Sequence, residues 1–249
     1  MAPSPGSPSC ASKVRTCATW SGVPRTINPG GTTRQKAGYP INSRWFRPYT
    51  YSDANKDGII QVNEVQVKGG TADTAFVYIG YSFPRDIIAV THGFDLLNRK
   101  LRLTLAFDYK GGWNLQDGGN NFQCNATPFS CRENMDPTAP LEWQARHVAK
   151  FYGSTVAGTV QKTDRGYYQN GQFWKFREFS ASYLLPTGAL RYVRARDGST
   201  VVLGLRNITT WSSYTGLDPE EHDQPNDIQS NFQSAGPSTY VTLRLNLKY

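Results

Sequence analysis

The chain has 249 residues, a formal net charge of +8 and 38% hydrophobic residues. No apolar run approaches the roughly 20 residues that a membrane-spanning helix needs, so the sequence excludes a helical membrane protein. The Lys and Arg residues are scattered singly along the chain rather than clustered, so we expect no nucleic-acid partner despite the positive charge. The sequence holds no G-x-S-x-G, H-E-x-x-H or Walker-type motif, and we predict neither catalytic residues nor enzymatic activity.

Residues 1–40 are rich in Pro, Gly, Ser and Thr without a sustained period, and we interpret them as an irregular loop segment. The first eight residues lack the basic and apolar regions of an export signal. The chain is therefore either cytosolic or its true beginning lies upstream.

The four cysteines form two pairs with the same spacing, Cys10-x6-Cys17 and Cys124-x6-Cys131, in polar, turn-rich sequence. A zinc site usually has cysteines two to four residues apart, and no histidine lies near either pair in the sequence. The pattern favours two local disulfides in an oxidising compartment. His92, His147 and His222 are isolated in the sequence, and we interpret each as a plain surface or lumen residue.

One segment matches the twelve-residue calcium loop D-x-[DN]-x-[DN]-G-x5-E at every required place. The expected ligands are Asp53, Asn55, Asp57, the carbonyl of Ile59, and Glu64, with Gly58 making the sharp turn. The flanking sequences favour strands rather than the helices of an EF-hand, and an Asx-rich turn without metal is the alternative. No cofactor is required by the sequence, and Ca²⁺ is the one that it suggests.

A strand of mixed pattern is expected over residues 85–96, and alternating apolar and polar residues predict long strands over residues 101–110, 173–186, 200–211 and 239–249. The last is the most regular, because its odd-numbered positions 241–247 are apolar while Arg244 and Lys248 occupy the other face. Eleven residues exceed a typical soluble strand and match the roughly 9–11 residues of a tilted strand that crosses a bilayer. Leucines would then face lipid and charges a polar lumen. The 13% aromatic content fits interfacial girdles.

Long connections separate these strands. Residues 111–172 are expected to be mostly loop with one short helix from about 140 to 152, in which Leu141, Ala145, Val148 and Tyr152 form a stripe. A polar loop covers residues 214–237. Excursions of this length are unusual in a compact domain but ordinary on the outer face of a barrel.

Two strings carry a family resemblance: WKFREFSASYLLP over residues 174–186 and RNITTWSSYTGLDPE over residues 206–220. They resemble the C-terminal part of TonB-dependent outer-membrane receptors of the SusC/RagA type. The Asp53 loop and the following Tyr78-Ile-Gly80 and Pro84 also fit, and the resemblance covers roughly residues 40–249.

The resemblance implies an all-β fold: the C-terminal strands of a large antiparallel transmembrane β-barrel of about 22 strands with long extracellular loops. The sequence departs from the family by omitting the plug domain, the TonB box and the signal peptide. We therefore expect residues 41–249 to be the C-terminal portion of the barrel of a longer receptor, with Met1 an internal or false start. The parent would take up a large or scarce ligand, such as a glycan, siderophore or peptide, across the bacterial outer membrane.

The implied partners are the TonB complex, a SusD-like surface lipoprotein, outer-membrane lipid and the barrel-assembly machinery. That machinery would read a C-terminal signal formed by Leu243, Leu245, Leu247 and Tyr249. A ligand or partner contact is expected from the loop residues Trp211, Tyr214, Asp218 and Glu220, although these side chains could instead pack against neighbouring loops.

Two other functions are alternatives. A secreted, calcium-binding β-sandwich that binds glycans should fold in water without detergent. A complete small barrel acting as a passive pore would need at least eight membrane strands, and the sequence offers too few.

Overall fold

The computed structural model describes residues 10–11, 16–17, 26–30, 32–126, 130–221, 230–231 and 236–249. The chain forms two compact units, each assembled from segments that are separate in the sequence. The sheet unit consists of Arg85–Gly111, Gln172–Ser213 and Ala235–Tyr249. The loop unit consists of Met1–Pro84, Gly112–Gly171 and Tyr214–Ser234.

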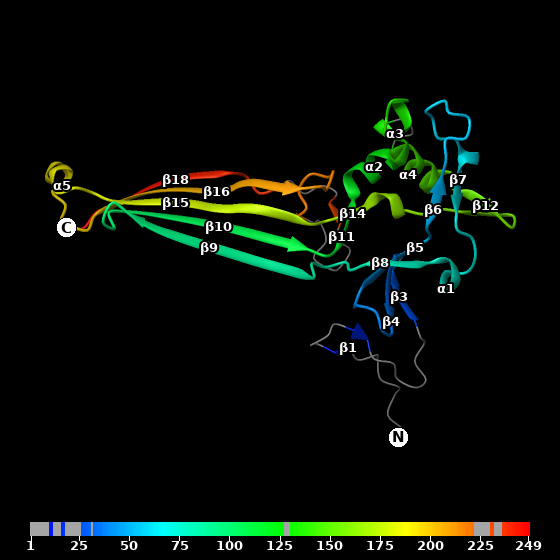
Figure 1. Ribbon diagram of the computed structural model, residues 1–249, viewed down its shortest axis with the longest axis horizontal. Coiled ribbons are helices and arrows are strands. Elements are labelled where there is room, and N and C mark those ends of the chain that lie inside the picture. The colour runs from blue at the N-terminus through cyan, green and yellow to red at the C-terminus, as the bar shows by residue number, and fades with distance from the viewer. Residues whose placement is uncertain are drawn as a thin grey trace, which may run out of the picture. The chain divides into compact units, whose positions relative to one another are not determined.

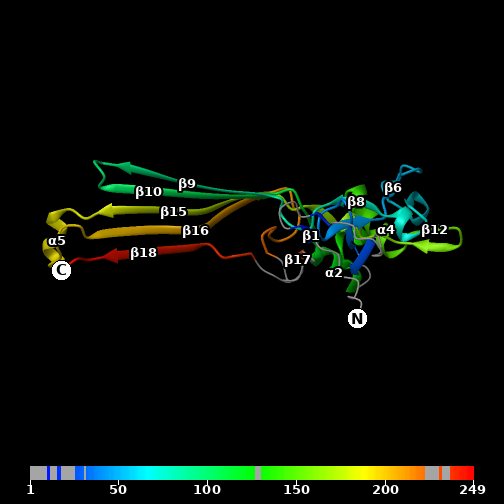
Figure 2. The same ribbon diagram turned by 90° about the horizontal axis from the view of Figure 1, so that it is seen from below.

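The sheet unit is one five-stranded antiparallel sheet in the order β18-β16-β15-β10-β9 (Figures 1 and 2). Its strands are β9 (Asp86–Leu96), β10 (Leu101–Gly111), β15 (Phe173–Leu184), β16 (Thr200–Ser212) and β18 (Tyr240–Asn246). Their centres and most of their bounds agree with the alternation in the sequence. The prediction of an all-β fold built from antiparallel strands is confirmed.

Two connections between strands lie at one end of this sheet. A four-residue turn joins β9 to β10, with Leu97, Asn98 and Arg99 all at positive φ. The β15–β16 connection holds helix α5 (Thr187–Val193), which ends at Arg194 in the left-handed region. At their other ends the five strands continue into the loop unit, so every segment of the loop unit joins the sheet at the same strand ends.

A β-bulge interrupts β15 at Arg177. Phe176 pairs with Phe107 and Glu178 with Ala106, so Arg177 has no residue opposite it on β10. The pairing with β16 shifts at the same place. An extra residue in one strand changes which face the following side chains occupy. Trp174 and Phe176 therefore share a face with Phe179 and Ala181, although their positions differ in parity.

The loop unit contains small sheets and short helices rather than one large sheet. A four-stranded sheet has the order β3-β4-β5-β8, a three-stranded sheet the order β14-β11-β17, and β1-β2, β6-β7 and β12-β13 are pairs. The strands are β1 (Cys10–Ala11), β2 (Thr16–Cys17), β3 (Thr26–Gly30), β4 (Thr33–Lys36), β5 (Ser43–Phe46), β6 (Tyr49–Tyr51), β7 (Val65–Val67), β8 (Val77–Gly80), β11 (Asn114–Asp117), β12 (Ser154–Val156), β13 (Thr159–Gln161), β14 (Tyr168–Asn170) and β17 (Ser230–Asn231). The helices are η1 (Val62–Glu64), α1 (Ala72–Ala75), α2 (Gly118–Ala126), α3 (Arg132–Met135), α4 (Leu141–Phe151) and η2 (Arg165–Tyr167).

These elements correct two expectations. The segment expected to be irregular up to residue 40 contains β3 and β4, which join the sheet of β5 and β8, so residue 40 is not a structural boundary. The excursion over residues 111–172, expected to be mostly loop, carries three further helical elements and four strands besides the predicted helix. Short strands of two to five residues give too few alternations to be recognised in a sequence. The helix expected near residues 140–152 is α4.

Helix α4 provides the main core of the loop unit. Its residues Ala145, Val148 and Ala149 form part of one buried cluster. They pack against Ile60, from the Asp53–Glu64 segment (the calcium-type loop), and against Val65 and Val67 of β7. Burying a side chain of this kind contributes roughly 1.5–3 kcal/mol. Two long-range hydrogen bonds also join these parts of the chain. Ile60 N–H donates to Gln144 Oε1 of α4 at 2.9 Å, and Val67 N–H donates to Ser154 Oγ of β12 at 2.7 Å.

Candidate functional site: a two-faced sheet and a calcium-type loop

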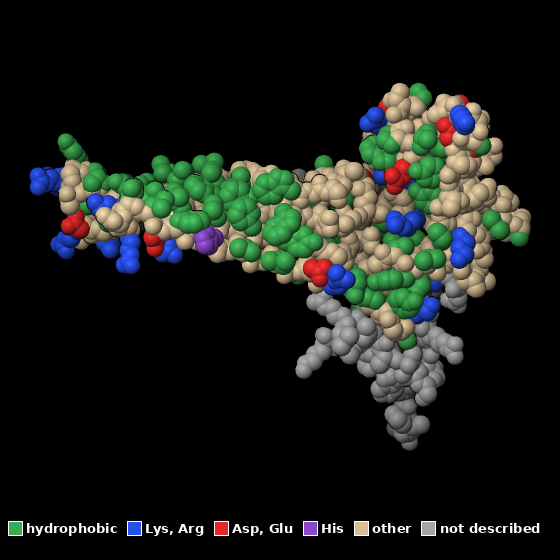
Figure 3. Space-filling view, in the orientation of Figure 1, with side chains coloured by type: hydrophobic (Ala, Val, Ile, Leu, Met, Phe, Trp, Pro, Cys, Tyr) green, Lys and Arg blue, Asp and Glu red, His purple; other side chains and the backbone are tan. Residues whose placement is uncertain are grey.

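One face of the five-stranded sheet is apolar across all strands. Residues directly opposite each other share a face, and Phe94, Leu103, Ala181, Leu203 and Leu243 form one such row. These side chains are not covered within the unit, since Leu243 is 74% and Leu203 is 39% exposed. Figure 3 shows the hydrophobic side chains as a broad band over the strands. A continuous exposed apolar surface marks a membrane or protein contact.

Aromatic side chains end this apolar face on the side where the strands enter the loop unit. Tyr109, Trp174 and Trp211 lie in one row of the register, with 4.9 Å between the Tyr109 and Trp174 ring centroids. The next row holds Phe107 stacked on Phe176 at 4.6 Å. Trp and Tyr combine an apolar body with a polar tip, which suits the boundary between hydrocarbon and water.

The opposite face of the sheet is polar and carries ion pairs. Arg177 Nε donates to Asp108 Oδ2 at 2.7 Å, and Arg206 Nε lies 3.3 Å from Glu178 Oε2. A third pair, Arg102 with Asp95, is separated by 3.9 Å and is well exposed. Such half-exposed pairs contribute at most about 1 kcal/mol each, so they mark a face that is solvated rather than a stabilising core.

The expected assembly-signal residues divide at the end of β18. Leu243 and Leu245 lie in the strand, opposite Leu203 and Val201. Leu247 and Tyr249 follow after the strand ends at Asn246. Their role in barrel assembly stays a prediction.

The Asp53–Glu64 loop adopts a compact, hydrogen-bonded conformation. Gly58, at φ +79°, makes the turn that the motif requires. Asp53 Oδ1 accepts the N–H of Asp57 at 3.2 Å, and its Oδ2 accepts the N–H of Gly58 at 3.0 Å. Glu64 closes the loop, because its Oε1 accepts the N–H of Ala54 at 2.8 Å and its Oε2 that of Gln61 at 2.9 Å.

These contacts agree with either interpretation of the loop. A carboxylate oxygen has a second lone pair that can face a cation while the first accepts a backbone N–H. The same bonds also stabilise an Asx-rich turn without metal. The Ile59 N–H, donating to Asp57 Oδ1 at 2.8 Å, is the main cause that holds the pKa of the exposed Asp57 carboxyl below its usual value. An ionised Asp57 is the form that a calcium site needs.

One of the two predicted disulfides is present in the structure: Cys124 is bonded to Cys131. The other pair lies on β1 and β2, where the backbones of Cys10 and Cys17 are directly opposite. Their side chains lie outside the described residues, so that disulfide stays a prediction.

The loop residues expected to contact a ligand are not gathered in one place by the structure. Trp211 belongs to the aromatic row of the sheet unit, whereas Tyr214 belongs to the loop unit and donates its hydroxyl to the carbonyl of Gln116 at 2.9 Å. Asp218 Oδ1 accepts the N–H of Glu220 at 2.8 Å in a local turn. A ligand contact of these four residues stays untested.

His147 is the residue that sequence reasoning misplaced. It is 5% exposed, and its Nδ1 lies 3.8 Å from Sγ of Cys131. The helical period of α4 does not predict this contact, because Cys124 and Cys131 come from a separate segment of the chain. His92 lies opposite Leu105 in the apolar face, next to Phe94. His222 lies outside the described residues.

Within the described part of the chain, no helix is long and apolar enough to cross a membrane. No protein-family model matches the chain, and no curated protein matches it. Solved structures of the RagAB peptide importer match the chain. The chain in the "open-open" state matches with a TM-score of 0.62 and 18% identity, and that of the RagAB peptide transporter with 0.63 and 18%. The matches cover 94% and 93% of this chain but 25% of each matched chain, so this chain spans about a quarter of their length. At this identity the likeness establishes the fold alone.

Proposed function

We propose that this chain is the C-terminal part of the β-barrel of a TonB-dependent outer-membrane receptor that imports a large or scarce ligand. The two-faced sheet carries this proposal: its long strands expose an apolar face that ends in an aromatic row, and their other face bears charges. A soluble sheet would cover that apolar face with its own chain.

The strand lengths fit a bilayer. An eleven-residue strand such as β10 rises roughly 36 Å at about 3.3 Å per residue. Tilted by about 45°, it covers roughly 26 Å of depth, which is close to the roughly 25 Å apolar band of outer-membrane barrels. The β9–β10 turn and the β15–β16 connection would lie on the periplasmic side and the loop unit outside the cell, where such barrels have their longer loops.

The sheet edges indicate that other strands accompany these five. Among the described strands, β9 pairs only with β10 and β18 only with β16. An open edge in lipid leaves backbone groups without hydrogen-bond partners, at several kcal/mol each. We infer that strands of a longer protein close the barrel, in agreement with the quarter-length match to the RagAB chains.

The ligand and the partners follow from the same resemblance. The matched structures are described as a peptide importer, so we propose peptide as the first ligand to test, with glycans and siderophores as alternatives. A SusD-like surface lipoprotein would bind on the loop side, and the TonB complex would supply energy from the periplasm. Barrel-assembly machinery would insert the protein through β18.

Lipid-phase photolabelling tests the membrane proposal. A diazirine dissolved in the bilayer should label alternate residues of β10 and β16 in outer-membrane preparations, sparing their neighbours on the polar face. A chain that is monodisperse in water without detergent, and that takes no label, would instead support the secreted calcium-binding sandwich. Peptide uptake that stops when the proton-motive force is collapsed would support TonB dependence, and unchanged uptake would favour a passive pore.

A further inference from the structure

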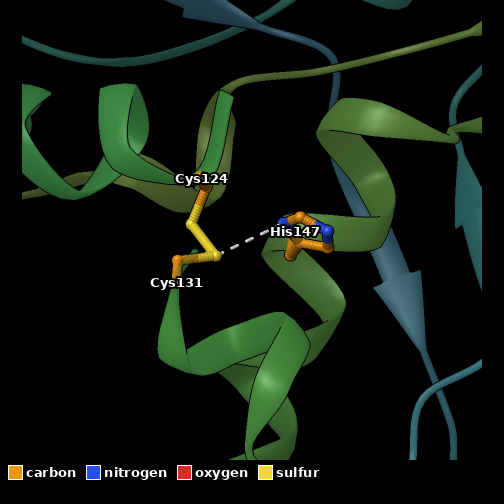
Figure 4. Close-up of side chains that lie close together, drawn as sticks. All are labelled: Cys124, Cys131 and His147. Carbon is orange, nitrogen blue, oxygen red and sulfur yellow. Dashed lines mark hydrogen bonds between the residues drawn. A yellow bond between two sulfur atoms is a disulfide. The ribbon is translucent and has the colours of Figure 1, made fainter. Parts of the chain in front are cut away.

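A buried cluster in the loop unit brings four potential metal ligands together, outside the sheet and the calcium-type loop. Figure 4 shows the disulfide between Cys124 and Cys131 with the His147 imidazole facing it. The sulfur atoms and an imidazole nitrogen lie within 4.8 Å of one another, and all three residues are buried. Glu133, 5% exposed, has its Oε2 3.5 Å from Sγ of Cys124.

The two oxygens of Glu133 have different surroundings. Oε1 accepts hydrogen bonds from Arg146, whose Nε lies at 3.0 Å, and from Asn120 Nδ2 at 2.8 Å. Oε2 faces the Cys124 sulfur, which carries no proton while it is part of a disulfide. The charge of Glu133 is therefore paired with Arg146 through Oε1, while the disulfide sulfur that Oε2 faces has no proton to donate to it.

We propose that reduction of the Cys124–Cys131 disulfide uncovers a binding site for Zn²⁺ or a similar divalent ion. Its ligands are the two cysteine thiolates, Nδ1 of His147 and Oε2 of Glu133. In a tetrahedral zinc site, a sulfur and a nitrogen or oxygen ligand lie about 3.6 Å apart, given bonds of about 2.3 and 2.0–2.1 Å. The observed separations of 3.8 Å to His147 and 3.5 Å to Glu133 already match this geometry.

The reaction balances without a buried net charge. A thiol reductant supplies two electrons and two protons, which convert the disulfide into two thiols while the reductant becomes a disulfide. Zn²⁺ then displaces both thiol protons to solvent. The two thiolates and Glu133 carry three negative charges, and Zn²⁺ with Arg146 carries three positive charges. The cluster is therefore neutral both before and after the ion binds, which avoids the cost of an unpaired buried charge.

His147 is suited to the role of a ligand. Its Nδ1 lies 3.8 Å from Sγ of Cys131, and a neutral imidazole nitrogen in this position is a common metal ligand. Coordination at Nδ1 requires the tautomer with its proton on Nε2. A cavity of about 800 Å³ is lined by both His147 and Glu133, together with Gln144 and Tyr152 among others, and opens two of the four ligand residues to solvent.

The test is Co²⁺ and Zn²⁺ binding by the purified full chain in detergent, before and after reduction with a phosphine. A Cys10→Ser/Cys17→Ser background removes the other cysteine pair. We expect one Co²⁺ per chain only after reduction, with the charge-transfer absorption of a tetrahedral thiolate site, and displacement of Co²⁺ by Zn²⁺. His147→Gln and Glu133→Gln should each weaken binding by at least about 10–100-fold, the loss that follows removal of a residue that only supports a metal ligand. His92→Gln, in the sheet unit, is the matched control and should change nothing.

Absence of Co²⁺ binding after reduction would overturn the proposal. Equal binding before and after reduction would do the same, as would unchanged affinity in both the His147 and the Glu133 variants. Alkylation gives an independent reading, because Zn²⁺ should protect Cys124 and Cys131 of the reduced chain. If reduction simply unfolds the loop unit, cobalt binding will not depend on His147, and that result also counts against the site.

Discussion

Arginine substitutions at two adjacent positions of β15 test which face of the sheet meets lipid. Ala181 lies between Leu103 and Leu203 in the apolar face, while Ser180 lies between Thr104 and Gly204 in the polar face. Both residues are small and lie side by side in the C-terminal half of the strand. An arginine on the lipid face costs about 2–4 kcal/mol at the bilayer midplane and less toward the interfaces, so this range is the upper limit for Ala181→Arg. On the lumen side its charge stays in water, so we expect Ser180→Arg to cost about 1 kcal/mol or less.

Urea unfolding of the protein in phospholipid vesicles, followed by tryptophan fluorescence, measures both effects. With a urea dependence of about 2 kcal/mol per molar, Ala181→Arg should lower the midpoint by up to about 1–2 M. Equal losses in both variants, or the larger loss at Ser180, would refute the assignment of the faces. Ala181→Leu separates lipid from a packed soluble core, because added methyl groups cost about 1–3 kcal/mol in a full core but little against fluid lipid.

Three further predictions concern the aromatic row, the calcium-type loop and a buried ion pair. Lipids brominated near the headgroup should quench tryptophan fluorescence more than lipids brominated at the chain ends. The double variant Trp174→Phe/Trp211→Phe should abolish most of that difference in quenching. A difference that stays unchanged in the variant would contradict an interfacial position of the aromatic row. Calcium at about 100 times its dissociation constant should stabilise the protein by about 2.7 kcal/mol, measured by urea unfolding with and without chelator. Glu64→Gln should remove this stabilisation. If calcium does not change the stability of the unaltered protein, the loop is an Asx-rich turn without metal. Arg146→Met should lower the free energy of unfolding by about 3–5 kcal/mol, because it leaves the buried carboxylate of Glu133 without its charged partner. Adding Glu133→Gln should restore much of this loss. Additive losses in the double-mutant cycle would show that the pair is not coupled.

Most of the long strands were predictable because alternation repeats along them, whereas β9 has a mixed pattern. In β10, Leu101, Leu103 and Leu105 alternate with polar neighbours for eleven residues, and no local turn signal competes with this pattern. The helix α4 was predictable for the same reason at its own period. Both elements are long enough for a periodic pattern to be distinguished from chance.

The bulge at Arg177 was not predictable, and it changes the aromatic row. Strict alternation from Phe179 places Trp174 and Phe176 on the polar face, opposite to where the structure places them. A bulge depends on the pairing of three strands, which a single strand's sequence does not contain. The local motifs of the loop unit were found by spacing, whereas the environment of His147 requires residues from α2, α3 and α4 to be assembled first.

The interleaved segments of the loop unit have a consequence for the order of folding. Its long-range hydrogen bonds include those of Ile60 with Gln144, 84 positions apart, and of Tyr214 with Gln116, 98 positions apart. Closing loops of this length delays folding, because the entropy is lost before the contacts form. The Cys124–Cys131 bond spans only seven positions and can form early. Since the other segments emerge from strands of the sheet, pairing of β9, β10, β15 and β16 brings them together. The loop unit should therefore reach its final structure after the sheet, and a strand inserted out of register would leave it incomplete.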